Sequence, residues 1–526
     1  MRRSILDCTL RDGGYVNEWK FGGKNIREIV HSLILSNIDI IELGYLTERN
    51  QNSQDSTLFN SILDINDLIP QMKNKSKFVV MMNFGGYDVE NIPVNVENKL
   101  DGIRVAFHKE NMTEALSICR KIKEKGYMVF VQPMVIPKYS DMELLKLIKE
   151  VNEIEVDALY IVDSFGSMNE YDVMRIFMLF EHNLKSNISI GFHSHNNLQL
   201  SFSNAQAILK NSNSNDIIID STILGMGRGA GNLNTELFIE YMNSNFDAKY
   251  KLIYILQIID NILYPIYKLN YWGYSVPYYL SAKNKCHPNY AAYLSNKNTL
   301  DVQSINQILT EISSEKRTTY DEQYIRNLYI SHQKHNTETI QENFSIIEDK
   351  IKDKKVVIIA SGRSLRNRKK EIKKFINENH AFVISVNFIP KEIEVNAVFF
   401  SNIKRFENTD IYDFEKTNLV ILTSNIITDN GGYVVIDYNS LLNENFVVAD
   451  NSGLMLIKLL ISLSVKEIYL AGFDGYDLNN ENYLKEELEF IKSGKDIVKI
   501  NKSIKEEIGK YNKKIKINFL TESKYK

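Results

Sequence analysis

Two histidines separated by one residue, His193 and His195, are the side chains of this sequence best suited to hold a metal ion. In an extended segment, side chains two positions apart leave from the same face. Two imidazoles that point the same way can share one ion. A His-x-His pair is also common in a purely structural role. We interpret the pair as ligands because a carboxylate, an arginine and a glycine-rich segment each follow other strand-like runs.

Two more residues complete the candidate metal site. Asp12 would be the third ligand, with turn formation as the alternative role. Asn232 ends a glycine-rich segment and could supply a carbonyl oxygen, with loop hydrogen bonding as the alternative. A mixed set of imidazole, carboxylate and amide with open positions suits Mn²⁺, Mg²⁺ or Co²⁺ better than a structural zinc site, and we favour Mn²⁺. Cys8 fits no ligand spacing, and we expect a small buried residue there.

Other polar residues lie at the ends of apolar runs, where a parallel sheet or barrel places its active site. We expect these side chains to contact the substrate: Glu42, Arg104, Gln132 and Asp163.

Short β-rich runs alternate with segments of helical periodicity through about the first 245 residues. Each run is apolar nearly throughout, as in parallel strands covered on both faces. Eight such units predict a closed (β/α)8 TIM barrel, and an open doubly wound sheet is the alternative. The expected strands are Ser4–Thr9, Asp39–Leu43, Lys77–Asn83, Gly102–Phe107, Met128–Gln132, Ala158–Asp163, Ile188–His193 and Asp216–Thr222.

The pattern divides the chain into three regions: residues 1–247 as the barrel, 248–350 as a helical cap or linker, and 351–526 as a Rossmann-like α/β domain. The helical region is rich in tyrosine, and we favour a cap packed on the barrel over a substrate lid or dimer arm. In the last region the expected strands are Val356–Ala360, Ala381–Val386, Ala397–Phe400, Leu419–Thr423 and Glu467–Ala471.

A second candidate site opens the C-terminal domain. Ser361, Gly362, Arg363 and Ser364 follow a strand and begin a helix. Backbone N–H groups at such a helix start can hold a phosphate, which predicts a nucleotide or sugar nucleotide. An ordinary capped turn is the alternative.

Composition narrows the classes of partner. The 526 residues include 63 basic and 66 acidic ones, for a net charge of -3, so nothing favours nucleic acid. The three cysteines are few and odd in number, which argues against a disulfide framework. This predicts a protein of the reducing cytoplasm. No apolar run approaches the roughly 20 residues of a membrane span. Whether the chain forms a homo-oligomer is left open by the sequence.

Five motifs together resemble a family of metal-dependent carbon–carbon bond enzymes. The motifs, spread over residues 4 to about 236, are DCTLRDGG, IELG, VDSFGSM, GFHSHNNLQLSFSNA and LGMGRGAGNLNTE. The family includes hydroxymethylglutaryl-CoA lyase, isopropylmalate and citramalate synthases, and 4-hydroxy-2-oxovalerate aldolase. The resemblance implies that Asp12, His193 and His195 bind the divalent metal, with Asn232 completing the set in the lyase branch. It also implies that Arg11 contacts substrate oxygens.

One position departs from the family pattern. In the oxovalerate aldolases, a histidine proposed as the catalytic base follows Arg-Asp-Gly by two positions, and here that residue is Tyr15. We expect Tyr15 to bind substrate or relay a proton. His108 and a water molecule are alternative bases.

The resemblance and the residues together predict an aldolase. Cleaving a carbon–carbon bond beside a carbonyl leaves an enolate, which a metal chelated by a 2-oxo acid stabilises. The expected protein is therefore a metal-dependent lyase for a 2-oxo acid. The alternatives are a synthase that condenses acyl-CoA with a 2-oxo acid, and a glycosyl- or sialyltransferase-type protein with a scaffold barrel. The cap (Trp272–Tyr293) weakly resembles one found in aldolase-like proteins of surface-polysaccharide gene clusters. The C-terminal domain loosely resembles a Rossmann-like domain of bacterial glycan-modifying proteins and some sialyltransferases. Both resemblances favour surface-carbohydrate biosynthesis.

Overall fold

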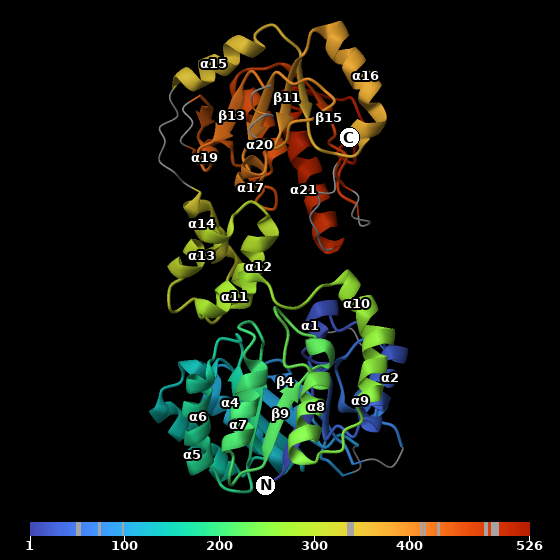
Figure 1. Cartoon of the computed structure of the whole chain (residues 1–526), viewed down its shortest axis with the longest axis vertical. Helices are drawn as coiled ribbons and strands as arrows, with labels where there is room; N and C mark the ends of the chain where they lie inside the picture. The colour runs from blue at the N-terminus through green and yellow to red at the C-terminus, as the bar shows by residue number, and fades with distance from the viewer. Residues whose placement is uncertain are drawn as a thin grey trace. The chain divides into compact units, whose positions relative to one another are not determined.

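The computed structural model describes residues 1–48, 54–71, 75–96, 99–333, 341–410, 414, 417–428, 432–477, 482–484 and 494–526. It forms two compact units (Figure 1). The first contains residues 1–292 and 312–320, and the second contains residues 293–311 and 321–526. The helical region expected over residues 248–350 therefore contributes to both units.

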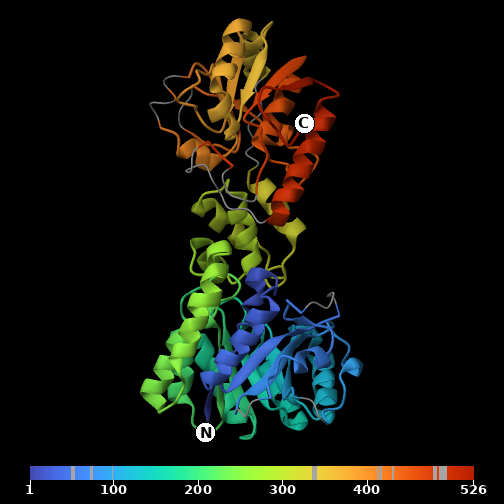
Figure 2. The same cartoon turned by 90° about the vertical axis from the view of Figure 1, so that its right-hand side faces the viewer.

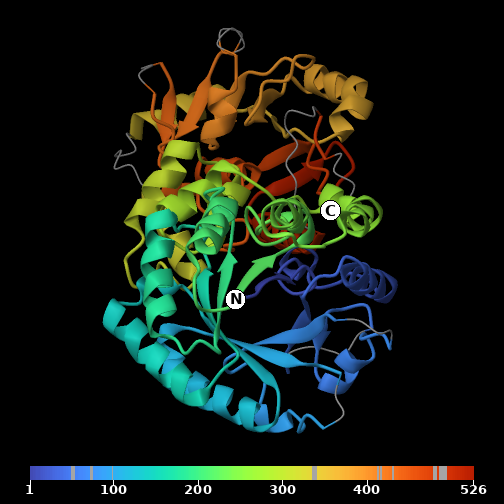
Figure 3. The same cartoon turned by 60° about the horizontal axis from the view of Figure 1, so that its bottom comes forward.

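The first unit is the TIM barrel that the sequence predicts. Strand β1 (Arg3–Asp7) pairs in parallel with both β2 (Ile40–Leu46) and β9 (Ile217–Ser221), and this double pairing closes the sheet. A short extra strand, β3 (Leu58–Phe59), pairs with the last two residues of β2, Tyr45 and Leu46. Figure 3 shows the strands running together inside the helices. The remaining strands are β4 (Lys77–Asn83), β5 (Gly102–Phe107), β6 (Met128–Pro133), β7 (Ala158–Asp163) and β8 (Ser189–Ser194).

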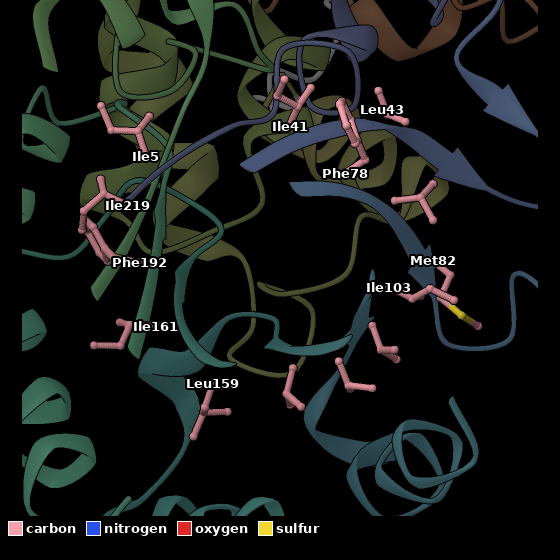
Figure 4. Packing of buried hydrophobic residues seen from close by; sticks show 14 of the residues in the cluster. Ile5, Ile41, Leu43, Phe78, Met82, Ile103, Leu159, Ile161, Phe192 and Ile219 are labelled. Atoms are coloured by element: carbon pink, nitrogen blue, oxygen red, sulfur yellow. The ribbon is translucent and has the colours of Figure 1, made fainter. Parts of the chain in front are cut away.

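Alternation along each strand separates two cores. Ile5, Ile161 and Phe192 point outward into the main cluster between strands and helices (Figure 4). Their neighbours Leu6 and Tyr160 lie in a second cluster inside the barrel. Because successive side chains of a strand point to opposite faces, polar residues between outward-facing apolar ones must point inward.

Helices cover the barrel and begin at recognisable caps. In α5 (Asp141–Ile154) and α6 (Glu170–Asn183), Ser140 and Asn169 each accept a backbone N–H of the first turn in a capping box. The other covering helices are α2 (Gly23–Leu35), α4 (Met112–Glu124), α7 (Ser201–Asn211) and α8 (Thr235–Phe246). Two short helices, α1 (Gly14–Asn17) and α3 (Ile62–Asn66), follow strand ends.

A longer helical stretch, made of α9 (Leu252–Ile258), η5 (Ile259–Leu263) and α10 (Tyr264–Leu269), packs on α2 and α8. Among the described residues it is the one stretch whose length and apolar composition would suit a membrane span. Its buried side chains, such as Ile258 and Leu263, belong to the core of the barrel. The chain continues into α11 (Val276–Lys283) and α12 (Pro288–Lys297).

The second unit is a parallel sheet with the order β14-β13-β12-β11-β10-β15-β16. The order reverses at β10, which pairs with β11 on one side and β15 on the other. Figure 2 shows this unit with α21 in red. The strands are β10 (Val356–Ile359), β11 (Phe382–Val386), β12 (Ala397–Phe400), β13 (Val420–Thr423), β14 (Val434–Ile436), β15 (Glu467–Ala471) and β16 (Lys516–Phe519). The helices are α13 (Val302–Glu311), α14 (Glu322–His332), α15 (Gln341–Ile351), α16 (Ser364–Asn379), α17 (Ile403–Glu407), α19 (Tyr438–Leu441), α20 (Ser452–Ser462) and α21 (Gly494–Tyr511).

Candidate metal centre and active site

The carboxyl ends of the barrel strands bring three predicted ligands together. Asp12 follows β1, His193 lies near the end of β8, and His195 follows that strand. All three are buried, and their ligand atoms lie within 4.8 Å of one another. Phe192 faces outward into the main core. Because side chains alternate along a strand, His193 points into the barrel, and His195, two residues later, points the same way.

Two buried acceptors in this cluster lack hydrogen-bond donors. Within the described part of the chain, neither His195 Nδ1 nor Asn232 Oδ1 has a hydrogen-bond partner. His195 Nδ1 lies 3.8 Å from Asp12 Oδ2, and the amide nitrogen of Asn232 donates to the same carboxylate oxygen at 2.5 Å. An acceptor left unsatisfied inside a protein is costly. A divalent cation would satisfy both, so the residues fit the expected ion.

The charge states suit ligation. Burial lowers the pKa of His195 to about 3, so its ring is neutral at neutral pH. Burial alone would raise the pKa of Asp12, but Arg11 and the two histidines outweigh it and hold that pKa well below its usual range. Metal ions bind neutral imidazoles and ionised carboxylates.

Asp220, at the end of β9, orients His193. Its Oδ2 lies 3.0 Å from His193 Nδ1, which leaves Nε2 as the nitrogen available to an ion. Carboxylates that fix the tautomer of a ligating histidine are a regular part of metal sites. Asp220 is not among the site residues predicted from the sequence, although a carboxylate inside the apolar run IIIDS was the available signal.

Cys8 also lies within ligand distance of His193 and Asp220. Its thiol donates to the carbonyl of Ser221 at 3.3 Å, and burial raises its pKa well above the usual value. The thiol therefore stays protonated, in agreement with the expectation of a small buried residue.

Arg11 is held on both sides by carboxylates. Its Nε donates to Glu42 Oε2 at 2.8 Å and its Nη1 to Asp12 Oδ1 at 2.7 Å. Its Nη2 is buried and has no partner among the described residues. A fixed guanidinium with one unpartnered donor beside Asp12 has the chemistry to bind an oxyanion.

Arg104, fully buried on β5, extends this chain of charges. Glu42 Oε2 lies 2.9 Å from its Nη1, and Asp220 pairs with its Nη2. The amide of Gln132, with its oxygen turned toward Arg104, accepts N–H groups from Nε at 3.3 Å and Nη2 at 3.1 Å. Opposite charges therefore alternate without interruption in the order Asp12, Arg11, Glu42, Arg104 and Asp220, and His193 lies beside the last of them.

Asp163 also lies at the carboxyl ends of the barrel strands, but its carboxylate binds the backbone of the loop that follows it. Its two oxygens accept the backbone N–H groups of Ser167 at 2.9 Å and Met168 at 3.0 Å. Burial raises its pKa to about 6. Substrate contact by Asp163, as by Glu42 and Gln132, stays a prediction.

Tyr15 lies at the barrel mouth with 40% of its surface exposed. Its hydroxyl is 3.2 Å from the hydroxyl of Tyr45, a residue that sequence reasoning did not single out. The guanidinium of Arg11 lies 5.9 Å from the centre of the Tyr45 ring, so the tyrosine pair reaches the charged cluster.

The predicted phosphate site of the second unit has a different occupant. The backbone N–H of Ser364 donates to Asp474 Oδ2 at 2.6 Å, and the Ser364 hydroxyl donates to Oδ1 of the same residue. A Cβ on Gly362 would lie 2.3 Å from the carbonyl oxygen of Gly472, so glycine is required there. This geometry is the capped turn that the sequence left as the alternative.

A wider cleft of about 590 Å³ lies beside this turn, at the carboxyl ends of the strands around the reversal of strand order. Asn387 and Ser452 form its polar floor, joined by a 2.6 Å hydrogen bond from the Asn387 amide nitrogen to the Ser452 hydroxyl. Ser361, Gly362 and Asp474 also line the cleft.

Comparison with known proteins places the first unit in a family. The model of the HMGL-like family matches residues 2–262. The barrel is an HMGL-like domain. A 4-hydroxy-2-oxovalerate aldolase from Carboxydothermus hydrogenoformans is 27% identical over 271 residues, which cover 50% of this chain and 77% of that enzyme. An oxaloacetate decarboxylase from Mycobacterium tuberculosis is 23% identical over 235 residues, covering 45% of this chain and 68% of that protein. The solved hydroxymethylglutaryl-CoA lyase from Pseudomonas aeruginosa is 14% identical with a TM-score of 0.42, covering 51% of this chain and 94% of that one.

Proposed function

We propose that the HMGL-like barrel is a divalent-metal-dependent carbon–carbon lyase that cleaves a 4-hydroxy-2-oxo acid. The observation that carries the proposal is the cluster of Asp12, His193 and His195, whose ligand atoms lie within 4.8 Å of one another. The relative from Carboxydothermus hydrogenoformans, named for 4-hydroxy-2-oxovalerate, supports the substrate class. Mn²⁺ is the ion we propose, because the ligands combine imidazole with oxygen donors.

The chain's own residues would stabilise the charge that cleavage creates. A bound divalent ion supplies Lewis-acid polarisation of the 2-oxo group. Arg11 directs its unpartnered Nη2 donor toward the developing enolate oxygen, while Glu42 and Asp12 keep the guanidinium in place. Donors of this kind contribute about 3 kcal/mol to the transition state in a water-excluded site.

A proton must leave the 4-hydroxyl as the carbon–carbon bond breaks. The electron pair of that bond passes to the enolate, and the hydroxyl carbon leaves as an aldehyde. We assign the relay of this proton to Tyr15, whose hydroxyl would accept it while passing its own proton to water at the exposed mouth, and which shares a hydrogen bond with Tyr45.

The assay that tests the lyase offers 4-hydroxy-2-oxo acids to the Mn²⁺-loaded full chain and measures release of a 2-oxo acid and an aldehyde. Metal-dependent release is expected. Release of free thiol from an acyl-CoA plus a 2-oxo acid, without cleavage, would instead favour the condensing synthase. No turnover with either pair at any divalent ion would contradict the proposal.

For the second unit we propose a nucleotide or sugar-nucleotide site, placed in the wide cleft and not at the start of α16. The amide of Asn387 and the hydroxyl of Ser452 support it, because both suit ribose or sugar hydroxyl groups. Calorimetric titration with nucleotides and sugar nucleotides tests this site. We also propose a role in surface-carbohydrate synthesis in the cytoplasm, which the resemblances of the cap and of this domain support. Sugar transfer by a chain with a disabled metal site would favour the transferase alternative.

A further inference from the structure

A third arginine at the barrel mouth differs from Arg11 and Arg104. Arg228 lies in the glycine-rich loop between β9 and α8. Arg11 and Arg104 are each paired with carboxylates, whereas no carboxylate in the described ranges pairs with Arg228. Its Nε is buried and has no hydrogen-bond partner there. Its guanidinium lies 5.3 Å from the centre of the Tyr15 ring. A partly buried cation without a counter-ion is costly unless a ligand supplies the opposite charge.

His287 of the cap provides a second donor beside Arg228. Its Nε2 lies 3.5 Å from Arg228 Nη1. Its Nδ1 accepts the backbone N–H of Asn289 at 3.2 Å. A neutral imidazole that accepts at Nδ1 carries its proton on Nε2. Burial, reinforced by Arg228, lowers the pKa of His287 to about 3, so the ring is neutral. The two facing groups are therefore both donors, and an anionic oxygen between them would satisfy both.

The pair lies just outside the metal ligands. Gly227 precedes Arg228, and a Cβ on Gly227 would be 3.1 Å from Asp12 Oδ2 and 2.3 Å from the amide nitrogen of Asn232. Arg228 is near enough to His195 to lower its pKa. The cap is fixed to the same loop, because Trp272 Nε1 donates to the carbonyl of Leu224 at 3.0 Å. A substrate held at the metal ligands would extend toward Arg228 and His287.

We propose that Arg228 and His287 form a subsite for a carboxylate at the end of the substrate remote from its 2-oxo acid group. The inference rests on the proposed function and narrows its substrate class: the aldehyde that leaves carries a carboxylate. Arginine suits this group because its planar fork matches a carboxylate in shape as well as charge.

Binding of two five-carbon acids tests the subsite. 2-Oxoglutarate carries the remote carboxylate, 2-oxopentanoate has a methyl group there, and neither has the hydroxyl that cleavage needs. Calorimetry on the Mn²⁺-loaded full chain should show 2-oxoglutarate binding about 10- to 100-fold more tightly, as for a charge-assisted hydrogen bond. Arg228→Gln should abolish that preference and leave the Kd of 2-oxopentanoate unchanged. Arg120→Gln, on the exposed face of α4, should keep the preference.

The outcomes separate the two proposals. Equal affinity for both acids in the wild type, or a preference that survives Arg228→Gln, would overturn the subsite alone. Failure of both acids to bind would overturn the 2-oxo acid assignment and the subsite with it. The unchanged 2-oxopentanoate affinity reports that a variant is folded. If Arg228→Gln does not fold, Arg228→Lys and His287→Gln replace it, and each should weaken 2-oxoglutarate alone.

Discussion

The two units use the same kind of sheet edge in opposite ways. At the carboxyl ends of the barrel strands, buried carboxylates and arginines alternate up to the two histidines. At the corresponding edge of the second unit, Asn387, Ser401 and Ser452 form a hydrogen-bonded group of neutral side chains. The carboxylate of Asp474 there caps the start of α16.

The difference shows what each edge can bind. Buried charges persist only when paired, and the barrel's network still leaves acceptors without donors beside Asp12. A divalent cation at that edge would satisfy these acceptors. In the second unit, neutral amides and hydroxyls can recognise a ligand by hydrogen bonds without an ion, and the charged side chains that also line the cleft include a paired one, Lys297 with Asp450. We therefore predict that a substitution in the site of one sheet edge, in the barrel or in the second unit, leaves ligand binding at the other edge intact.

The largest effect should come from removing a metal ligand. His193→Ala should lower metal-dependent kcat/KM by about 10³-fold or more, because Lewis-acid catalysis and substrate chelation are both lost. Cleavage kinetics at saturating Mn²⁺ measure it, and nucleotide binding to the second unit should not change. His182→Ala, an exposed histidine of α6, is the matched control. If the His193→Ala variant were as active as the wild type, the assignment of His193 as a metal ligand would be wrong.

Tyr15→Phe should lower kcat by about 10²-fold, the usual contribution of a positioned proton-transfer group. KM should stay within about threefold, because only the hydroxyl is removed. Steady-state kinetics provide the measurement, and Tyr171→Phe on the exposed face of α6 is the control. A full-rate Tyr15→Phe variant would exclude Tyr15 as the proton carrier and leave His108 to be tested.

Asp220→Asn should weaken metal binding by about 10- to 100-fold, as expected for a partner that orients a ligating histidine. Calorimetric titration with Mn²⁺ gives the Kd. Asp247→Asn, at the exposed end of α8, should bind like the wild type. Equal metal affinity in Asp220→Asn would mean that His193 needs no orienting partner.

Asn387→Ala should weaken nucleotide binding in the cleft by about 10-fold or more, because it removes an amide that would bond the ligand and that also holds Ser452 and the backbone of Ser401. Barrel turnover should be unaffected. Asn379→Ala, at the C-terminal end of α16, is the control. A parallel loss of lyase activity in Asn387→Ala would break the separation between the two edges.

The last effect concerns the pH dependence of the free energy of unfolding, and not activity or binding. The folded pKa of His287 is lowered to about 3, so the unfolded chain takes up this proton first as the pH falls below about 6.5. His287 therefore stabilises the fold fully above that pH, and the contribution is lost on acidification at up to about 1.4 kcal/mol per pH unit. Urea unfolding of the metal-free protein between pH 7 and pH 4 gives the free energy of unfolding at each pH. This free energy should fall less steeply on acidification in His287→Gln than in the wild type. Identical slopes would show that His287 titrates normally.

Most of the fold could be read from the sequence because buried parallel strands are apolar on both faces. The eight barrel strands and five strands of the second sheet are all present. β14 and β16 were missed: β14 has three residues, and β16 alternates polar Lys516 and Asn518 with apolar residues. Such edge strands carry little of the continuous apolar signal.

Some residues of the candidate sites could likewise be predicted from the sequence, and others could not. Asp12, His193 and Arg11 could be identified because each lies in a motif that stands at a strand end. Asp474 could not be placed at the start of α16, since 110 residues separate it from Ser364. The contact of His287 with Arg228 is equally invisible in the sequence, because it depends on how the cap folds over the mouth.

Titration of Mn²⁺ into the metal-free full chain, followed by calorimetry, tests the central claim most directly. We predict that the wild type binds one ion per chain and that both His193→Ala and Asp12→Asn lose that binding. Failure of the wild type to bind any divalent ion, or undiminished binding in both variants, would contradict it.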